Sequence, residues 1–359
     1  MMRSKLTALA VLSVTGAVVF AGCGSDDNKS SSSSGSKTAS SGKGKTVCAV
    51  MPDADSSSRW VHNDQPTLTK QFTDAGFKVN IQNAQNDTQK YATIAQQMLT
   101  SGCNLMVLTD LNGAGIQVTQ KAKAQGIPVI AYDRPIKGAD YYVSFDNFHV
   151  GELEGQMVVD GLKAAGKDPK TAKVVYSGGD PTDGNAAQFY DGANKVMTAA
   201  GIKPAFKTPG TWDQQKSQTY FEQGYTKLNG NVDAVWAAND TNAGSAITVL
   251  DKNGKKVPVS GQDATPPGLQ NVLLGKQFGT VYKPYQLEAK ATVDLGQQLL
   301  KGQKPTVDKK APDGTPFIAE TPTIVTTKNM QQVFDDGNAK VTDVCTGSAK
   351  AACDKYNIH

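Results

Sequence analysis

Short apolar runs alternate with helical patterns from Lys45 onward, and this alternation constrains the fold more than any other feature of the sequence. In the first half of the chain, helical patterns at 65–76, 88–102 and 114–126 separate apolar runs at 46–52, 77–84, 104–110, 127–133 and 141–147. The pattern at 88–102 places Tyr91, Ile94, Ala95 and Met98 on one helical face. Strands that alternate with helices of this length predict a parallel sheet covered on both faces.

The same alternation begins again in the second half. Apolar runs occur at 172–178, 232–240, 257–263 and 278–284, with helical patterns at 186–201, 217–230 and 242–254 between or beside them. A helix at 286–302 and a last strand at 321–327 follow. Because 359 residues are enough for two domains, we predict an α/β fold of two doubly wound parallel-sheet lobes. A ligand cleft is expected between the carboxyl ends of their strands.

The first residues have the layout of an export signal. Arg3 and Lys5 precede an apolar run that ends in small residues before Cys23. We predict a signal peptide at 1–22 and a flexible Ser/Gly linker at 23–44. We also predict lipidation of Cys23, because "FAGC" resembles the lipobox of bacterial lipoproteins. An ordinary signal peptide is the alternative. No other apolar run in the sequence is long enough to span a bilayer, so we expect the protein on the outer face of the cell membrane, held there by the lipid anchor only.

Four further cysteines follow Cys23. An exported protein meets oxidising conditions, so we predict disulfides. Cys48 lies in the first strand and Cys103 just before the third; these strands are neighbours in a doubly wound sheet, which favours a Cys48–Cys103 pair. Cys345 and Cys353 would then close a short loop. Four free or metal-bound thiols are the alternative, although zinc is disfavoured because no CxxC element is present.

Charge and composition exclude several kinds of partner. The net charge of +4 is small for this length and no Lys/Arg cluster indicates a nucleic-acid surface. Three His residues do not favour a His-rich metal site. The Gly-rich segments lack the spacing of a dinucleotide or phosphate-binding loop. We therefore expect no cofactor, no metal and no nucleic acid.

Polar residues collect where the apolar strands end. Arg59 and Trp60 follow the first strand, and Asp133 and Arg134 follow the fourth. Later strands end in "FDN", "SGGDPTDGN", "AANDTNAG", "SGQDAT" and "VYKPYQ". Any single Asp or Asn here could be the N-cap of the next helix. Arg59, Arg134 and Lys283 do not fit that explanation, so caps alone do not account for the set.

A polyhydroxylated ligand would account for it. Carboxylates accept hydrogen bonds from sugar hydroxyls, and Arg or Lys donates to them. The amides of Asn185 and Asn239 can do either. Trp60 and Trp212 stand beside polar residues and could stack on a pyranose, although core packing is the alternative for any Trp and is our expectation for Trp236.

The strand-end motifs resemble those of the type I periplasmic sugar-binding proteins of ABC importers, and within them the D-xylose-binding proteins. The resemblance runs from about Lys45 to Lys328 and rests chiefly on "AYDR" at 131–134, "SGQDA" at 260–264 and "VYKP" at 281–284. Supporting pieces are "RW" at 59–60, "SFDN" at 144–147 and "GELEG" at 151–155. The first-strand loop "PDADSSSRW" and the tail after Lys328 depart from the family pattern.

The resemblance implies a sugar pocket and a discontinuous domain plan. The implied ligand residues are Arg59, Trp60, Asp133, Arg134, Asn185, Trp212, Asn239, Asp263 and Lys283. It also implies a three-stranded hinge that crosses near Asp146, Pro284 and Pro316, giving an N-terminal lobe of 45–145 plus 284–316 and a C-terminal lobe of 146–283 plus 317–359. Sugar would bridge both lobes and stabilise the closed form.

The expected function is therefore capture of a monosaccharide, xylose or a related aldose, by a monomer that delivers it to an ABC permease and its ATPase. A sugar or autoinducer sensor that presents its ligand to a receptor kinase is the main alternative. An enzyme is disfavoured because no nucleophile–base arrangement is evident, although paired carboxylates for glycoside hydrolysis stay open. A repressor of the lactose-repressor type would need a helix-turn-helix and no export signal, and this chain has the opposite.

Overall fold

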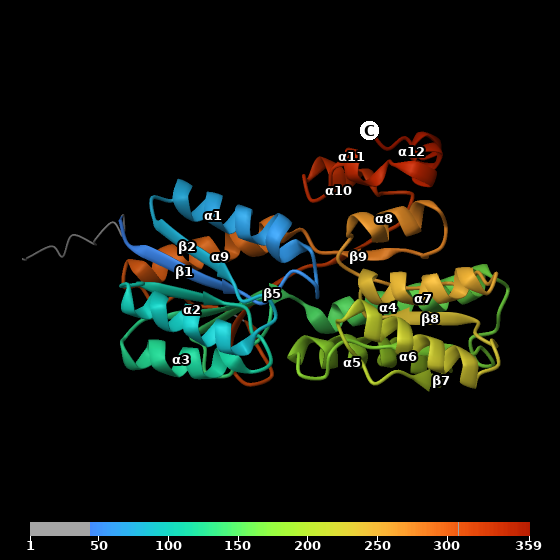
Figure 1. Cartoon of the computed structure of the whole chain (residues 1–359), viewed down its shortest axis with the longest axis horizontal. Coiled ribbons are helices and arrows are strands. Elements are labelled where there is room, and N and C mark those ends of the chain that lie inside the picture. Colours follow the sequence, from blue (N-terminus) through green and yellow to red (C-terminus); the bar gives the residue numbers. More distant parts are fainter. Residues whose placement is uncertain (1–43, 308) are drawn as a thin grey trace, which may run out of the picture. The chain divides into compact units, whose positions relative to one another are not determined.

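The computed structural model describes residues 44–307 and 309–359 (Figure 1). The expected signal peptide at 1–22, the lipidation site Cys23 and the linker as far as residue 43 lie outside the described residues.

The first lobe is built on a seven-stranded sheet with the order β10-β11-β5-β4-β3-β1-β2. All neighbouring strands run parallel except β10, which is antiparallel to β11. The strands are β1 (Thr46–Met51), β2 (Lys78–Asn83), β3 (Leu105–Leu108), β4 (Val129–Tyr132), β5 (Tyr141–Phe145), β10 (Lys309–Lys310) and β11 (Pro316–Glu320).

Helices cover both faces of this sheet, as the alternation predicted. Side chains on β1 point to the two faces in turn: Cys48 and Val50 pack with α2 and α3, whereas Val47, Ala49 and Met51 pack with α1 and α9. Figure 1 shows these two helix pairs on opposite sides of the sheet. The helices are α1 (Gln65–Asp74), α2 (Thr88–Thr100), α3 (Ala114–Ala124) and α9 (Tyr285–Leu300), and a π-helical turn, Trp60–Asp64, precedes α1.

The second lobe has a shorter parallel sheet with the order β7-β6-β8 and a two-stranded antiparallel sheet of β9 and β12. Two isolated bridges, Val235 to Val259 and Gln262 to Val281, connect them. The elements are β6 (Val174–Ser177), β7 (Pro204–Lys207), β8 (Ala234–Ala237), β9 (Thr280–Tyr282), β12 (Thr323–Val325), α4 (Asn147–Ala164), α5 (Gly184–Ala199), α6 (Gln214–Lys227), α7 (Asp240–Lys252) and α8 (Pro266–Leu273). The predicted doubly wound two-lobe fold is thus confirmed.

Some elements differ from the prediction. The expected strand at 257–263 is reduced to the two bridges, because Pro258 has no N–H to donate to a continuous ladder. The sequence does not predict α4, whose glycines look like helix breakers. A Cβ on Gly151 would lie 2.1 Å from the carbonyl oxygen of Phe189. Gly151 therefore serves the close approach of α4 to α5.

The chain crosses between the lobes after β5, after β9 and after β11. The first two crossings lie at Asp146 and Pro284, next to the ends of β5 and β9. The third was expected near Pro316 and instead follows Glu320. Phe317 to Glu320 pair with β5, and the rings of Phe317 and Tyr142 stack at 4.5 Å. The position implied by the resemblance is thus a few residues early, because Pro316 begins β11, and proline is tolerated as the first residue of a strand.

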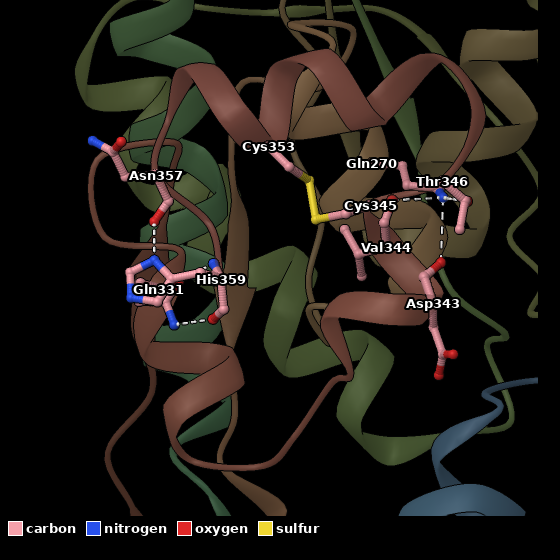
Figure 2. Close-up of a disulfide and its surroundings, with 9 residues drawn as sticks. All are labelled: Gln270, Gln331, Asp343, Val344, Cys345, Thr346, Cys353, Asn357 and His359. Carbon is pink, nitrogen blue, oxygen red and sulfur yellow. Dashed lines mark hydrogen bonds between the residues drawn. A yellow bond between two sulfur atoms is a disulfide. The ribbon is translucent and has the colours of Figure 1, made fainter.

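The tail after Lys328 folds onto the second lobe. Its helices are α10 (Gln331–Asp335), α11 (Val341–Val344) and α12 (Lys350–Lys355), with a 3-10 turn, Gly347–Ala349, before α12. Their apolar side chains share a core with α8, β9 and β12. Gln270 of α8 donates to the carbonyl oxygen of Val344 at 3.0 Å and to Thr346 Oγ1 at 3.1 Å (Figure 2).

Both predicted disulfides are present. Cys48–Cys103 ties β1 to the turn before β3, two strands that pair directly, and Cys345–Cys353 closes the tail (Figure 2). Among the helices at 44–307 and 309–359, none is both long and apolar enough to cross a membrane.

Candidate functional site

All nine predicted ligand residues line one pocket between the two lobes. The carboxyl ends of β1 and β4 face it from the first lobe, and those of β8 and β9 face it from the second. It is lined by Ser56, Ser57, Arg59, Trp60, Asp133, Arg134, Asp183, Asn185, Phe189, Trp212, Asn239, Gln262, Asp263 and Lys283. The empty space inside this pocket is about 30 Å³. A second, outer cavity of about 240 Å³ is also lined by Ser56, Arg134, Asp183 and Trp212.

Three buried ion pairs occupy this pocket. Arg59 Nη1 lies 2.9 Å from Asp133 Oδ2, and Lys283 Nζ lies 2.8 Å from Asp263 Oδ1. Arg134 Nε lies 3.2 Å from Asp183 Oδ2, and this pair joins the two lobes. The adjacent residues Asp133 and Arg134 thus have different partners. A ligand that donates to the carboxylates and accepts from the cations can exchange with these pairs, because charged groups make the stronger hydrogen bonds.

Asp133 of the first lobe and Asp263 of the second share an unusual backbone conformation. Asp133 has φ +60° and Asp263 has φ +94°, in the region that side chains with a Cβ rarely adopt. Each donates its N–H to the neighbouring crossing strand: Asp133 to the oxygen of Val143 at 2.8 Å, and Asp263 to the oxygen of Val281 at 2.9 Å. Such strained residues persist where surrounding contacts fix them and are concentrated at functional sites.

Asn185 connects the lobes within the pocket. Its Nδ2 donates to the carbonyl oxygen of Asp133 at 2.8 Å, and its Oδ1 accepts from Tyr142 and Asn147, both at 3.0 Å. The contacts with Asp133 and Tyr142 cross between the lobes, whereas the contact with Asn147 lies within the second lobe. Asn185 lines the predicted site, but in this arrangement it fixes the lobes rather than offering free hydrogen-bonding groups.

The two tryptophans differ in their surroundings. Trp60 is buried in the first-lobe core, and the guanidinium groups of Arg59 and Arg134 lie 4.8 and 5.5 Å from its ring centre. Trp212 is half-buried, and its Nε1 donates to Asp183 Oδ2 at 3.1 Å. A Cβ on Gly179 would lie 2.1 Å from the Trp212 ring, so glycine is needed there for the ring to occupy its place.

Asn239 combines the two roles that the sequence left open. Its Oδ1 accepts from the N–H of Asn242 at 2.8 Å, so it caps α7, and it also lines the pocket. The cap leaves the Nδ2 group of Asn239 as its donor toward a ligand. Trp236 is in the core, as predicted, and its Nε1 donates to Glu154 at 2.8 Å.

The sequence analysis missed five lining residues: Ser56, Ser57, Asp183, Phe189 and Gln262. Gln262 is the most informative, because its Nε2 donates to the oxygen of Ala238 at 2.6 Å while its buried Oε1 has no partner among the described residues. Ser57 Oγ is unpartnered in the same way. Gln262 stands within the quoted motif "SGQDA", so the signal was present, but its orientation depends on the bridge to Val281.

Burial and charge act against each other at the pocket ions. Burial alone would lower the pKa of Lys283, but the charges of Asp263 and Asp133 raise it above its ordinary value. Burial raises the pKa of Asp183 despite the opposing charge of Arg134. Within the described ranges, no group of three or more His, Cys, Asp or Glu side chains is arranged to hold a metal ion.

A model of the periplasmic binding protein domain matches residues 48–304 of the chain. This chain belongs to the periplasmic binding protein family. The match spans both lobes and includes every lining residue, so the pocket described above is the interlobe cleft of a periplasmic binding protein.

Several well-matched relatives have names that refer to sugars. The D-xylose-binding periplasmic protein of Escherichia coli is 33% identical over 80% of this chain and 88% of its own length. The multiple sugar-binding periplasmic receptor ChvE of Rhizobium radiobacter is 33% identical over 81% of this chain and 90% of its own length. The resemblance to D-xylose-binding proteins is thus confirmed.

A solved structure supports the same conclusion. An ABC transporter solute-binding protein from Clostridium phytofermentans with bound β-D-glucose superposes with a TM-score of 0.76 and is 27% identical. The superposition covers 84% of this chain and 100% of the other. The whole two-lobe body therefore has the architecture of an ABC transporter binding protein.

Proposed function

We propose that this periplasmic binding protein captures a monosaccharide, xylose or a related aldose, in the interlobe pocket and delivers it to an ABC permease and its ATPase. One observation carries the proposal: acceptors and donors from both lobes meet in a single buried pocket, as three ion pairs with two tryptophans beside them. Hydroxyls that both donate and accept match this set, and a neutral ring leaves its charge balance unchanged.

The proposed cycle is hinge closure around the ligand. The sugar stabilises the closed form because only that form brings both sets of groups to it. The oxygen of Gln262 and the hydroxyl of Ser57 would gain partners on binding, which lowers the cost of burying them. We propose binding rather than catalysis, since relatives of both sequence and structure are named as binding proteins.

Isothermal titration calorimetry against neutral pentoses and hexoses tests the function. We expect micromolar or tighter binding of xylose or a related aldose, with a rise in the melting temperature. Binding of none of these sugars would overturn the proposal. A charged sugar phosphate is the control, and it should bind more weakly because it would bury charge in a pocket whose ions are already paired.

We further propose that the protein works as a monomer tethered at the outer face of the membrane through lipidated Cys23. Supporting this is the lipobox-like "FAGC" followed by a Ser/Gly tract. Cys23→Ala should release the protein from the membrane fraction; unchanged retention would contradict the anchor.

A receptor role is a second candidate, favoured by the word "receptor" in the name of the Rhizobium radiobacter relative. Both roles share the binding step. Loss of sugar uptake on deletion of the gene supports transport, whereas unchanged uptake with a lost transcriptional response to the sugar supports sensing.

A further inference from the structure

Arg59 is held from behind by two carboxylates that do not line the pocket. Its Nε and Nη2 donate to Asp64 at 2.7 and 2.6 Å, and Nη2 also donates to Glu288 Oε2 at 2.7 Å. A guanidinium has five N–H groups, so these three contacts use the Nε proton and both Nη2 protons. The Nη1 group is left to face the pocket, where it meets Asp133.

Asp64 and Glu288 have no exposed side-chain surface and come from different elements. Asp64 ends the π-helical turn before α1, and its Oδ1 also accepts from the hydroxyl of Tyr132. Glu288 lies in the first turn of α9, which begins directly after the second crossing between the lobes. Neither residue is among those that line the pocket, and Arg59 is the lining residue with which both make ion pairs.

We propose that Asp64 and Glu288 are positioning residues that fix the Arg59 guanidinium so that its Nη1 edge is the donor presented to the sugar. The inference rests on the proposed function and deepens it. A free arginine side chain loses much rotational freedom when it binds a ligand, and prior fixation removes that loss from the binding step.

Glu288 supplies Arg59 with an accepting oxygen in a cluster of three acidic residues. Asp64, Asp133 and Glu288 surround a single guanidinium. Burial, reinforced by the charge of Asp133, raises the pKa of Glu288 well above its ordinary range. The contact with Arg59 is made through one oxygen, Oε2, and glutamine retains an accepting oxygen of the same reach. Glutamine should therefore replace Glu288, whereas leucine should not.

Calorimetry on the full chain separates positioning from packing. We expect Glu288→Leu to weaken sugar binding by about 10- to 100-fold and Glu288→Gln by less than about threefold. In an Arg59→Gln background, Glu288→Leu should change affinity less than about twofold, because its effect passes through Arg59. Asp294→Asn, on the exposed side of α9, is the matched control and should bind as the unmodified protein does.

A second readout needs no ligand. The chain has three arginines, Arg3, Arg59 and Arg134, so ¹⁵N-arginine labelling gives a side-chain spectrum that can be assigned by substitution. Slow rotation should keep separate Nη signals for Arg59 in the unmodified protein and in Glu288→Gln, and these should merge in Glu288→Leu. If Glu288→Leu does not fold, Asp64→Asn takes its place. Asp64 accepts from Nε and Nη2 with both of its oxygens and asparagine has only one, so the same losses are expected.

The outcomes distinguish the inference from the function on which it rests. Wild-type binding with an unweakened Glu288→Leu variant, or equal effects of Glu288→Leu with and without Arg59, would overturn the positioning role and leave the function standing. Absence of sugar binding by the unmodified protein would overturn the function. In that case, Arg59 signals unaffected by Glu288→Leu would also overturn the positioning role, and merged signals would support it.

Discussion

Asp133 combines several roles in the pocket. Its carboxylate pairs with Arg59, its carbonyl oxygen accepts from Tyr142, Ser144 and Asn185, and its φ is +60°. The side chain belongs to the proposed ligand site, while the carbonyl oxygen binds β5 and, through Asn185, the second lobe. A substitution at Asp133 must therefore be designed to separate these two contributions.

Comparison of Asp133→Asn with Asp133→Ala makes that separation. Both remove the carboxylate that meets Arg59 Nη1, and we expect both to weaken sugar binding by about 100-fold or more, because a charge-assisted acceptor for the sugar is lost and Nη1 loses its partner. Asparagine tolerates the left-handed backbone, whereas alanine should cost about 1 kcal/mol more. Calorimetry and thermal denaturation measure the two effects. Normal binding by Asp133→Asn would remove Asp133 from the ligand set.

At the residue scale, the sequence predicted which residues line the pocket better than it predicted the contacts that their side chains make. The strand-end pattern and the family resemblance together indicated nine residues, all of which line the pocket. They could not indicate that Asn185 is engaged across the lobes, because that depends on the relative placement of Asp133 and α5. Asp64 and Glu288 were also missed, since buried carboxylates one layer behind a pocket have no motif of their own.

The same contrast holds for the elements. The sequence predicted strands such as β3 and β4, because strands that are buried on both faces have continuous apolar sequences. The helix α4 was missed because its glycines serve packing against α5 and not chain reversal. β7 and β11 were missed because they are short and mostly half-buried, so "PAFK" and "PFIAE" are not continuous apolar runs.

The buried Glu154 of α4 should make the stability of the protein depend on pH. Burial raises its pKa well above the ordinary value, and Oε1 has no partner among the described residues. Because the folded pKa exceeds the unfolded one, the folded state retains a proton that the unfolded state releases. The contribution of Glu154 to the free energy of unfolding is full below the pKa of about 4.3 that a glutamate has in the unfolded chain. As the pH rises above that value, this contribution falls by about 1.4 kcal/mol per pH unit, until the pH passes the pKa of Glu154 in the folded protein.

Glu154→Gln should therefore flatten the decline of stability with rising pH above about 5. Urea denaturation at pH 6, 7 and 8 measures it, with Glu222→Gln on the exposed side of α6 as the control. An identical slope in Glu154→Gln and the unmodified protein would show that Glu154 does not titrate in this window.

The two disulfides should differ in their contribution to stability. Cys48–Cys103 closes a loop with a sequence separation of 55, whereas Cys345–Cys353 closes one of 8. Loop-closure entropy predicts losses of about 4 kcal/mol and about 2–3 kcal/mol for the respective double Cys→Ala variants. Chemical denaturation measures both, and sugar affinity should be unchanged in the tail variant because Cys345 and Cys353 do not line the pocket. A larger loss from the tail pair would contradict the entropic account.

At the scale of the whole molecule, the contacts between the lobes should set the balance between open and closed forms. Asn185→Ala removes a hydrogen bond to Asp133 and an acceptor for Tyr142 and Asn147. We expect sugar affinity to fall by about tenfold, since the bonds to Asp133 and Tyr142 cross between the lobes, each is worth about 1 kcal/mol, and only the closed form makes them.

Small-angle X-ray scattering provides the measurement. The radius of gyration of the unmodified protein should decrease on addition of sugar, and Asn185→Ala should require more sugar for the same decrease. Asn231→Ala, an exposed substitution in the second lobe, is the control. A scattering curve that does not change with saturating sugar would contradict hinge closure.

The late position of β11 in the chain also affects biosynthesis. Residues of the first lobe up to Phe145 leave the ribosome early, but the edge of β5 is covered only when Pro316–Glu320 arrives. Until then β5 is an open strand edge of the kind that promotes association between chains. Translation must therefore pass through most of the second lobe before the first sheet can close, so a nascent chain interrupted before residue 316 should be prone to aggregate and to depend on chaperones that hold it unfolded.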